Sequence, residues 1–421
     1  MRKTESSECT GRGTLMDRIT HSDNLNNAYK RVKRNKGAPG IDGMTLEQLA
    51  LYLKEQGETV RSCLQQGKWQ PSPVRKVMIP KPDGGERQLG IPTVLDRLAQ
   101  QAIQQILQED WDTNFSPYSY GFRPKRSAHH ALFQAKQYIR KGYDWIVDID
   151  LSKFFDRVNH DRLMSTLAQY TDDKEALRLI RRFLTSGVME EGVLSKSTVG
   201  TPQGGPLSPV LSNIVLDELD RELDRRGLRY VRYADDYRIF VKSYRAGQRV
   251  LESLTRFIEG QMKLKVNVEK SGVARPWEHS FLGYIFSKKG EFVISPKAIK
   301  KFKREVKQLT KKHGCSLMQR LTRLNMYLRG WQQYFSLVRP IYFRDFDKWI
   351  RRRLRCLMWF QWKTAKRRFK ELVSRGASRR AAAQMAASSK KYWRMSCTPT
   401  LSRALSNSWF VDIGLQRLSL T

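Results

Sequence analysis

The sequence predicts an α+β fold on three observations. Short stretches with strand-like apolar patterns occur at 74–91, 144–151 and 230–242. Long amphipathic stretches, of which 94–109 (VLDRLAQQAIQQILQE) is the clearest, lie between them and predict helices. After residue 295 only helical patterns continue. We therefore expect one α+β region over roughly 70–295, followed by a helical region.

The composition indicates a nucleic-acid partner. The 421 residues include 78 Lys and Arg against 41 Asp and Glu, a formal net charge of +37. A charge of this size repels itself unless a polyanion is bound, so RNA or DNA is expected. We expect no membrane partner and a cytosolic protein, because no apolar run approaches the ~18 residues of a membrane span and the N-terminus (MRKTESSECT) lacks a signal-peptide pattern. The five cysteines are scattered without a C-x-x-C pair, which argues against a disulfide framework or a zinc site.

The elements follow in order along the chain. Residues 1–70 have apolar residues at helical spacing, interrupted by the loop NKGAPGIDGM. Apolar residues on both sides of Pro82-Asp-Gly-Gly85 predict a β-hairpin over 74–91. The helix 94–109 comes next, then the short strand DWIVDIDL (144–151) and the strand–turn–strand YVRYADDYRIFVK (230–242).

The region after residue 295 predicts basic helices. Ser295 and Pro296 favour a helix start, and apolar residues at helical spacing continue to near Gly314. Residues 351–380 contain 12 Lys and Arg against one acid, Glu371. Large aromatic residues alternate with these charges: Trp349, Trp359, Phe360, Trp362 and Phe369. Because basic charge follows phosphates and aromatic rings stack on bases, we expect nucleic-acid contact here rather than only a solvated helix face.

Acidic residues in two of the strand-like stretches predict a Mg²⁺ site. In a strand alternate side chains share a face, so Asp148 and Asp150 are expected to point away from the core. Asp235 and Asp236 interrupt two apolar arms, as the tip of a hairpin would. If the two stretches lie side by side, Asp150, Asp235 and Asp236 converge, and such a cluster is unfavourable unless cations neutralise it. Hard oxygen ligands open to water and phosphate suit Mg²⁺, two of which can promote the displacement of pyrophosphate by a hydroxyl. For the Asp235-Asp236 pair alone, an ordinary acidic turn is the alternative.

Taken together, the motifs resemble those of group II intron-encoded reverse transcriptase/maturases over nearly the whole chain. YADD, DIDLSKFFDRVNHD and GTPQGGPLSPVLSNIVLDELD resemble palm motifs. NKGAPGIDGM resembles the family's N-terminal extension, IPKPDGGERQLGIPTVLDR and YGFRPKRSAHHA its fingers, LKVNVEKS and FLGY its later palm, and LRGWQQYF its thumb. The resemblance implies a right-hand polymerase of fingers and palm with an α-helical thumb and a basic C-terminal segment. The implied domains are the extension (1–70), fingers and palm (71–295), thumb/maturase domain (296–375) and a DNA-binding segment (376–421).

The resemblance also implies a catalytic metal site. Asp150, Asp235 and Asp236 match the catalytic carboxylates that bind Mg²⁺, and the backbone carbonyl of Leu151 matches a further ligand. Asp148 shares the strand face of Asp150, but the family pattern puts the catalytic role on the second Asp of DID.

Five further residues match positions that bind the dNTP in the family. Phe155 matches an aromatic steric gate that excludes a ribose 2′-hydroxyl, whereas Phe154 is expected to be core. Lys81 and Arg87 match a triphosphate-binding pair, whose charge suits phosphate oxygens. The loop TPQGGPLSP has two glycines that allow backbone to approach a ligand closely, and the resemblance puts Gln203 beside the incoming nucleotide. Lys270 matches a lysine able to protonate the departing pyrophosphate.

The sequence departs from the family pattern in two places. Tyr237 follows YADD where a Cys or another small residue is frequent, which is expected to change packing beneath the hairpin without removing a ligand. Paired cysteines and a His-rich HNH pattern are absent, so the chain resembles the short lineage without the endonuclease domain. Members of that lineage are expected to use a pre-existing single-stranded DNA or a nascent strand as primer.

The function implied is an RNA-directed DNA polymerase that copies its intron and assists its splicing and mobility. Its expected partners are intron RNA, an RNA template, a DNA primer or target and dNTPs, in a bacterial-type cytoplasm and at the nucleoid when on target DNA; the oligomeric state is left open. One alternative is a splicing-only maturase, which the intact carboxylates disfavour. The other is a domesticated reverse transcriptase in DNA repair or defence, which would have the same active site and differ by lacking an intron RNA around its gene.

Overall fold

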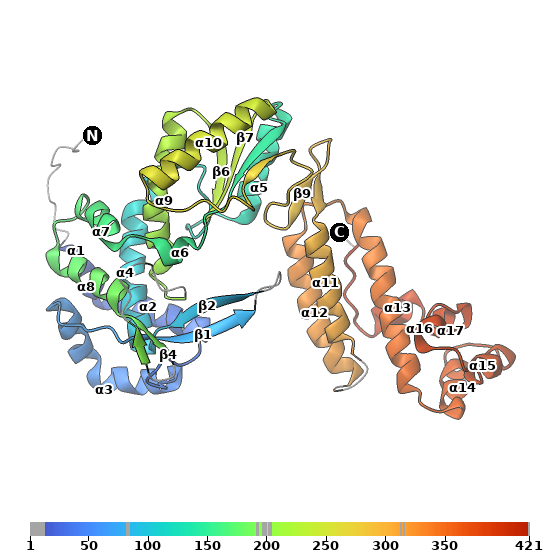
Figure 1. Cartoon of the computed structure of the whole chain (residues 1–421). Helices are drawn as coiled ribbons and strands as arrows, with labels where there is room; N and C mark the ends of the chain where they lie inside the picture. Colours follow the sequence, from blue (N-terminus) through green and yellow to red (C-terminus); the bar gives the residue numbers. More distant parts are fainter. Residues whose placement is uncertain are drawn as a thin grey trace. The chain divides into compact units, whose positions relative to one another are not determined.

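The computed structural model describes residues 13–80, 85–190, 193–195, 200, 204–311, 314 and 316–419. The chain forms two compact units, Met1–Arg275 and Pro276–Thr421 (Figure 1). The division falls earlier than the expected boundary at 295, because the FLGY stretch packs with the helices that follow it. Tyr334 donates a hydrogen bond from its hydroxyl to the carbonyl of Leu282 at 2.7 Å, and the Tyr284 and Phe335 rings lie 5.0 Å apart.

The first unit contains an antiparallel sheet with strand order β6-β7-β3-β8. β6 (Arg229–Tyr233) and β7 (Asp236–Val241) form the hairpin predicted over 230–242, and β3 (Trp145–Ile149) is the predicted strand at 144–151. β8 is short (Gly272–Ala274). Three helices contact these strands (Figure 1): α5 (Ala128–Arg140), α9 (Ser208–Arg225) and α10 (Tyr244–Gly260). The sheet therefore has a helical cover, which buries the apolar side chains of β3 and β7.

A second sheet in the same unit has the order β2-β1-β4-β5. β1 (Val74–Pro80) and β2 (Glu86–Ile91) form the antiparallel hairpin that the sequence predicts over 74–91. β4 (Val188–Glu190) pairs in parallel with β1, and β5 (Val193–Ser195) pairs with β4.

Helix α4 (Val94–Asp112) confirms the helix predicted over 94–109 and connects the parts of the first unit. Thr93 caps it by accepting a hydrogen bond from the amide of Asp96, and its apolar face is almost completely buried. The N-terminal helices α1 (Leu15–Thr20), α2 (Ser22–Asn35) and α3 (Leu46–Gln65) pack on α4, so they belong to the same compact unit rather than to a separate extension. Three shorter helices complete the unit: α6 (Phe154–Arg157), α7 (His160–Ala168) and α8 (Lys174–Thr185).

The second unit is mainly helical. A hairpin of β9 (Tyr284–Phe286) and β10 (Phe292–Ile294) leads into α11 (Pro296–Leu309), whose start the sequence predicts at Ser295-Pro296; Ser295 caps it through the amide of Ala298 at 3.2 Å. The remaining helices are α12 (Leu317–Tyr334), the 3₁₀ helix η1 (Pro340–Phe343), α13 (Arg344–Gln361), α14 (Ala365–Ser374), α15 (Arg379–Ala386), α16 (Tyr392–Met395), α17 (Pro399–Ala404) and α18 (Asn407–Asp412).

The end of the chain returns to the start of α13. The buried carboxylate of Asp347 accepts hydrogen bonds from the amides of Leu418 and Ser419, each at 3.0 Å. Gln332 of α12 donates to the carbonyl of Leu418 at 2.9 Å. The segment 376–421, expected as a separate part, is thus joined to the preceding helices in one compact unit. Within the described residues, no helix has the length and apolar character needed to cross a bilayer.

Candidate active site

The β6–β7 hairpin presents two adjacent acids at its tip. Tyr233 pairs with Asp236, which leaves Ala234 and Asp235 as a two-residue turn. β3 pairs with β7 up to Ile149 and Tyr237, and the next residue along each strand is Asp150 on one and Asp236 on the other. The register thus brings Asp150 to the tip of the hairpin, as expected from the two stretches lying side by side.

Asp150 is held in place by a turn after residue 265. Its backbone amide donates to the Ser271 hydroxyl at 3.0 Å, and its carbonyl accepts from the amide of Asn267 at 2.8 Å. The side-chain amide of Asn267 donates to the carboxylate of Asp150 at 3.0 Å. Leu151, the residue after Asp150, is buried and forms an isolated β-bridge with Val266. The chain after β3 is therefore held at both Asp150 and Leu151.

The three carboxylates interact electrostatically. The pKa of Asp236 is raised to about 6 by partial desolvation and then by the charges of Asp235 and Asp150, while the Lys270 ammonium acts in the opposite direction. Asp236 nevertheless remains open to solvent on one side, as does Lys270. Asp236 thus lies within electrostatic reach of two further acids at the open end of the sheet, a cluster of like charges that raises its pKa in addition to burial.

The donor set fits a hard divalent cation such as Mg²⁺. It consists of carboxylate oxygens, and the mutual repulsion at Asp236 is the condition that a bound cation relieves. In the described part of the chain, no three His, Cys, Asp or Glu side chains already surround one point as a closed ligand set. One oxygen of Asp150 accepts from Asn267 instead. The carboxylates are therefore electrostatic neighbours rather than a preassembled cage.

Asp148 has a structural role, although it shares a strand face with Asp150 and was expected to point away from the core. It is buried, and it pairs across the strands with Arg238, with which it forms an ion pair. Burial alone lowers the pKa of Arg238, and the Asp148 carboxylate supplies the opposite charge that the buried guanidinium requires. Asp148 therefore stabilises the sheet, whereas Asp150 stands at its open end.

Phe155 lies in the segment that follows Asp150. Phe154 is 2% exposed and belongs to the core, as expected, whereas Phe155 is only half-buried against that core. Gly200 packs on the backbone of Phe155. The carbonyl oxygen of Gly200 lies 2.6 Å from Nε2 of the buried His160 ring. The half-buried ring of Phe155 thus retains a free face close in sequence to Asp150.

Three of the predicted dNTP contacts cannot be placed as side chains. Lys81 and Gln203 lie outside the described residues. The backbone of Arg87 is described in β2, where it pairs with Ile79, but its side chain is not. In the glycine loop, Gly204 lies close to strand β2. A Cβ there would stand 2.6 Å from the carbonyl oxygen of Gly90 in β2.

The aromatic residues of the basic helices also require a correction. Trp359 and Trp362 are 1% and 2% exposed, so neither ring is available to stack on a base. Arg368 lies over the Trp359 ring at 4.8 Å and Arg375 over the Trp362 ring at 5.3 Å. Trp349, Phe360 and Phe369 are half-buried. These rings mainly form the core of the second unit, and positive charge lies on exposed side chains such as Lys366 and Lys370.

Comparisons with known proteins agree with this architecture. Residues 79–286 match the model of reverse transcriptase (RNA-dependent DNA polymerase), and residues 299–376 match the maturase-specific domain of group II introns. Protein YkfC of Escherichia coli (strain K12) is 32% identical over 65% of this chain and 81% of its own length. The chain belongs to the family of group II intron-encoded reverse transcriptases and maturases.

Further relatives of this reverse transcriptase extend the comparison. The group II intron-encoded protein LtrA of Lactococcus lactis subsp. cremoris is 30% identical over 61% of this chain. The match covers 54% of LtrA, so this chain spans about half of that relative's length. Among solved structures, a partial Cas6-RT-Cas1–Cas2 complex is similar with a TM-score of 0.38 and 24% identity, over 62% of this chain and 44% of that chain. Membership of the family makes the chain an RNA-directed DNA polymerase with nucleic-acid substrates and a divalent-metal requirement.

Several residues around the carboxylates were missed in the sequence. Asn267 and Ser271 hold Asp150, and both lie in or beside the stretch NVEKS, where only Lys270 is singled out by the resemblance. Asn267 and Ser271 are polar residues on either side of Lys270 at the end of a strand-like stretch, and this pattern is the signal that could have identified both. Arg232 and Asp220, buried near the hairpin, carry no signal in the sequence beyond their place in the motifs.

Proposed function

We propose that this reverse transcriptase extends a DNA primer on an RNA template with Asp150, Asp235 and Asp236 as the ligands of two Mg²⁺ ions. The register that brings Asp150 to the tip of the β6–β7 hairpin beside Asp235 and Asp236 is the observation that carries the proposal. The pKa of Asp236, raised by burial and by the charges of Asp235 and Asp150, supports it. When bound, the two ions activate the primer 3′-hydroxyl and stabilise the charge that develops on pyrophosphate. The backbone carbonyl of Leu151 is a further proposed ligand.

The chain's own residues orient the reaction. Asn267 and Ser271 fix the backbone and one carboxylate oxygen of Asp150, next to the hairpin tip. The Lys270 ammonium is exposed and within electrostatic reach of Asp236, which suits a proton donor to pyrophosphate. Lys81 and Arg87 are proposed to bind the triphosphate and Gln203 to contact the incoming nucleotide.

The free face of Phe155 is proposed to exclude a ribose 2′-hydroxyl. Phe155→Val should therefore increase ribonucleotide incorporation while dNTP incorporation continues. The measurement is the ratio of kcat/KM for dNTP and rNTP on one primer–template. The neighbouring core residue gives the control: Phe154→Leu should leave that ratio unchanged. An unchanged ratio in Phe155→Val would remove Phe155 from this role.

The biological context follows from the family. The match of 299–376 to the maturase-specific domain supports binding of intron RNA and assistance to its splicing. We propose that residues 1–70 and the thumb helices α11 and α12 contact RNA, and that 376–421 contacts target DNA, at the nucleoid of a bacterial-type cytoplasm. Of the acids in 376–421 only Asp412 opposes the basic side chains, Arg379, Arg380, Lys390, Lys391, Arg394, Arg403 and Arg417.

Primer extension on an annealed RNA template tests the proposed site. With dNTPs and Mg²⁺, the wild type should give full-length cDNA, and Asp235→Ala should give none while its RNA affinity stays close to wild type. Loss of both synthesis and RNA binding in Asp235→Ala would indicate a folding role instead. Absence of product from both proteins, with RNA binding intact, would favour a maturase that acts only in splicing.

A further inference from the structure

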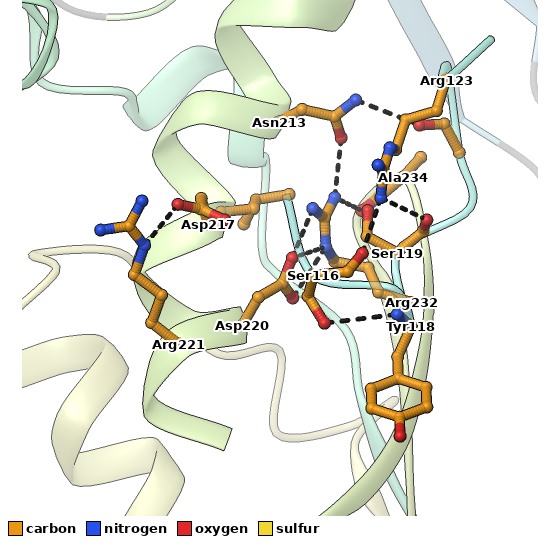
Figure 2. Close-up of polar contacts among 12 residues, drawn as sticks. Ser116, Tyr118, Ser119, Arg123, Asn213, Asp217, Asp220, Arg221, Arg232 and Ala234 are labelled. Carbon is orange, nitrogen blue, oxygen red and sulfur yellow. Dashed lines mark hydrogen bonds and ion pairs between the residues drawn. The ribbon is translucent and has the colours of Figure 1, made fainter. Parts of the chain in front are cut away.

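Arg232 occupies a fully buried site two residues before the Ala234-Asp235 turn. Its Nε and Nη2 donate to the carboxylate of Asp220, at distances of 2.6–2.9 Å. Its Nη1 donates to Asn213 Oδ1 at 2.8 Å and to the backbone carbonyl of Ala234 at 3.1 Å (Figure 2). Every nitrogen of the guanidinium therefore has a partner inside the protein, and one partner is the turn itself.

The turn that Arg232 contacts is conformationally strained. Ala234 has a φ of 57°, in the left-handed region that residues with a Cβ rarely adopt. Gly121 packs on it so closely that a Cβ at Gly121 would stand 2.9 Å from the Cα of Ala234. Strain of this kind persists only where the surrounding contacts over-determine the conformation.

Asn213 connects Arg232 to the segment packed against the strained turn. Its Oδ1 accepts from Arg232 (Figure 2), and its Nδ2 donates to the carbonyl of Gly121 at 3.1 Å. Asn213 and Asp220 both belong to α9 and are 0% exposed, so the helix provides the fixed base of the arrangement. One guanidinium thus connects α9 to the turn, and one amide connects α9 to the segment packed against the turn.

The chemistry of the arrangement requires an arginine and a carboxylate. A guanidinium spreads five N–H donors over three nitrogens in a planar fork, which here reach a carboxylate, an amide and a carbonyl at separate positions, whereas the three N–H donors of a lysine share one nitrogen. The Asp220 carboxylate balances the charge that burial would otherwise disfavour.

We propose that Arg232, Asp220 and Asn213 are positioning residues that hold the Ala234 turn in the conformation that presents Asp235 and Asp236. This inference rests on the proposed role of those two carboxylates in metal binding. None of the three positioning residues touches substrate; each acts through the backbone of the turn.

Hydrogen–deuterium exchange of the folded protein tests the proposal without relying on activity. In Asn213→Ala and in Arg232→Lys, the amides of residues 233–237 should exchange about tenfold faster, while peptides of α4 and α10 stay at wild-type rates. Asn213→Ala is the milder change and decides the question if Arg232→Lys does not fold. Arg123→Lys is the matched control, because Arg123 is also buried and held by Asp112, but its hydrogen bonds within the described part of the chain go to Asp112, Ser116 and Ser119 and not to residues 233–237. It should leave 233–237 at the wild-type rate.

Two results would overturn the proposal. One is wild-type exchange at 233–237 in the folded variants, and the other is an equal rise throughout the unit, which indicates general destabilisation.

A second readout separates positioning from mere folding. In Asn213→Ala the Mg²⁺ concentration for half-maximal primer extension should rise several-fold, while the KM for primer–template stays near wild type. A lower kcat with an unchanged Mg²⁺ requirement would contradict the proposal.

Asp235→Ala separates this proposal from the proposed function: it should abolish synthesis, yet leave the Arg232 and Asn213 contacts in place. If Asp235→Ala still synthesised DNA, the metal site would be wrong, whereas the exchange data would still decide the role of Arg232.

Discussion

The two compact units bury arginine side chains in different ways. In the first unit three buried guanidiniums meet carboxylates: Arg232 binds Asp220, Arg238 pairs with Asp148, and Arg123 donates to Asp112 at 2.8 Å. A fourth, Arg97, donates to the backbone carbonyl of Ala38 instead. Burial acts to lower the pKa of Arg232, but the charge of Asp220 acts in the opposite direction, and the pKa is raised overall.

In the second unit several half-buried arginines lie over aromatic rings without a carboxylate, among the described residues, in an ion pair with them. Rings also lie beneath Arg123 and Arg232 of the first unit, but there a carboxylate is bound as well. Arg352 lies 4.0 Å from the centroid of Trp393, and Arg355 lies 5.4 Å from that of Phe410. Burial lowers the pKa of Arg355, and no carboxylate is among the groups that act on it. Residues 276–421 contain only seven acids, against 33 Lys and Arg: Glu278, Glu291, Glu305, Asp345, Asp347, Glu371 and Asp412.

The difference follows from what each unit has to do. A carboxylate cancels the charge of an arginine and fixes its direction, which suits a framework that must hold catalytic groups in place. An aromatic ring stabilises a guanidinium through its quadrupole and leaves the positive charge in place, which suits a surface that attracts a polyanion. The first unit therefore gains defined geometry from its arginines, and the second keeps its net charge.

The largest expected effect is on the buried pair Asp220–Arg232. Asp220→Asn leaves Arg232 buried without its carboxylate, which should lower the free energy of unfolding by about 3–5 kcal/mol. Chemical denaturation followed by tryptophan fluorescence measures it. The matched surface control is Asp161→Asn, which removes the partner of the exposed Arg181 and should cost less than about 1 kcal/mol. Equal losses in the two variants would contradict the role assigned to the buried pair.

A pH-dependent effect of intermediate size is expected at Asp217. Its carboxylate is buried, one oxygen has no hydrogen-bond partner, and its partner Arg221 is largely exposed. Burial raises the pKa of Asp217 to about 6, so the folded state binds this proton more tightly than the unfolded state. The stability that this proton contributes is complete below the unfolded pKa near 4 and is lost as the pH rises through about 6.

Asp217→Asn should therefore be more stable than the wild type by roughly 1–3 kcal/mol at pH 7, with the advantage disappearing below pH 4. Unfolding free energies of both proteins across this range measure the difference. A wild type that is more stable than Asp217→Asn at pH 7 would mean that the Arg221 ion pair outweighs the burial of the charge.

The smallest effect is expected at a ring-stacked arginine. Trp393 beneath Arg352 is 40% exposed, so Arg352→Met should cost only about 0.5–1 kcal/mol of unfolding free energy. The same change should weaken RNA binding slightly and reduce its salt dependence, if Arg352 contacts phosphate. Titrations at several salt concentrations measure both. A stability loss as large as that of Asp220→Asn would remove the distinction between the two units.

The sequence predicted those parts of the site that depend on local pattern. The hairpin at 230–242, the strand at 144–151 and the helix at 94–109 all follow from apolar periodicity, and the structure confirms them. The role of Asp148 could not be read in this way, because it depends on the register that places Arg238 opposite it.

The burial of Trp359 and Trp362 also depends on tertiary packing. An aromatic residue among basic residues has the same local pattern whether its ring stacks on a base or fills a core. Only the packing of α13 and α14 with the helices that follow decides between the two. The FLGY stretch also shows the effect of tertiary packing, since it resembles palm sequence and packs with α12 in the compact unit that begins at Pro276.

Metal binding itself gives the most direct test of the three-carboxylate site. Mn²⁺ titration followed by electron paramagnetic resonance, with primer–template present, measures it without catalysis. The wild type and Asp156→Asn, a change at an exposed acid beside the site, should bind Mn²⁺ alike, whereas Asp150→Asn and Asp235→Asn should lose most of the tight binding. Wild-type titration curves in Asp150→Asn and Asp235→Asn would contradict the assignment of these carboxylates as metal ligands.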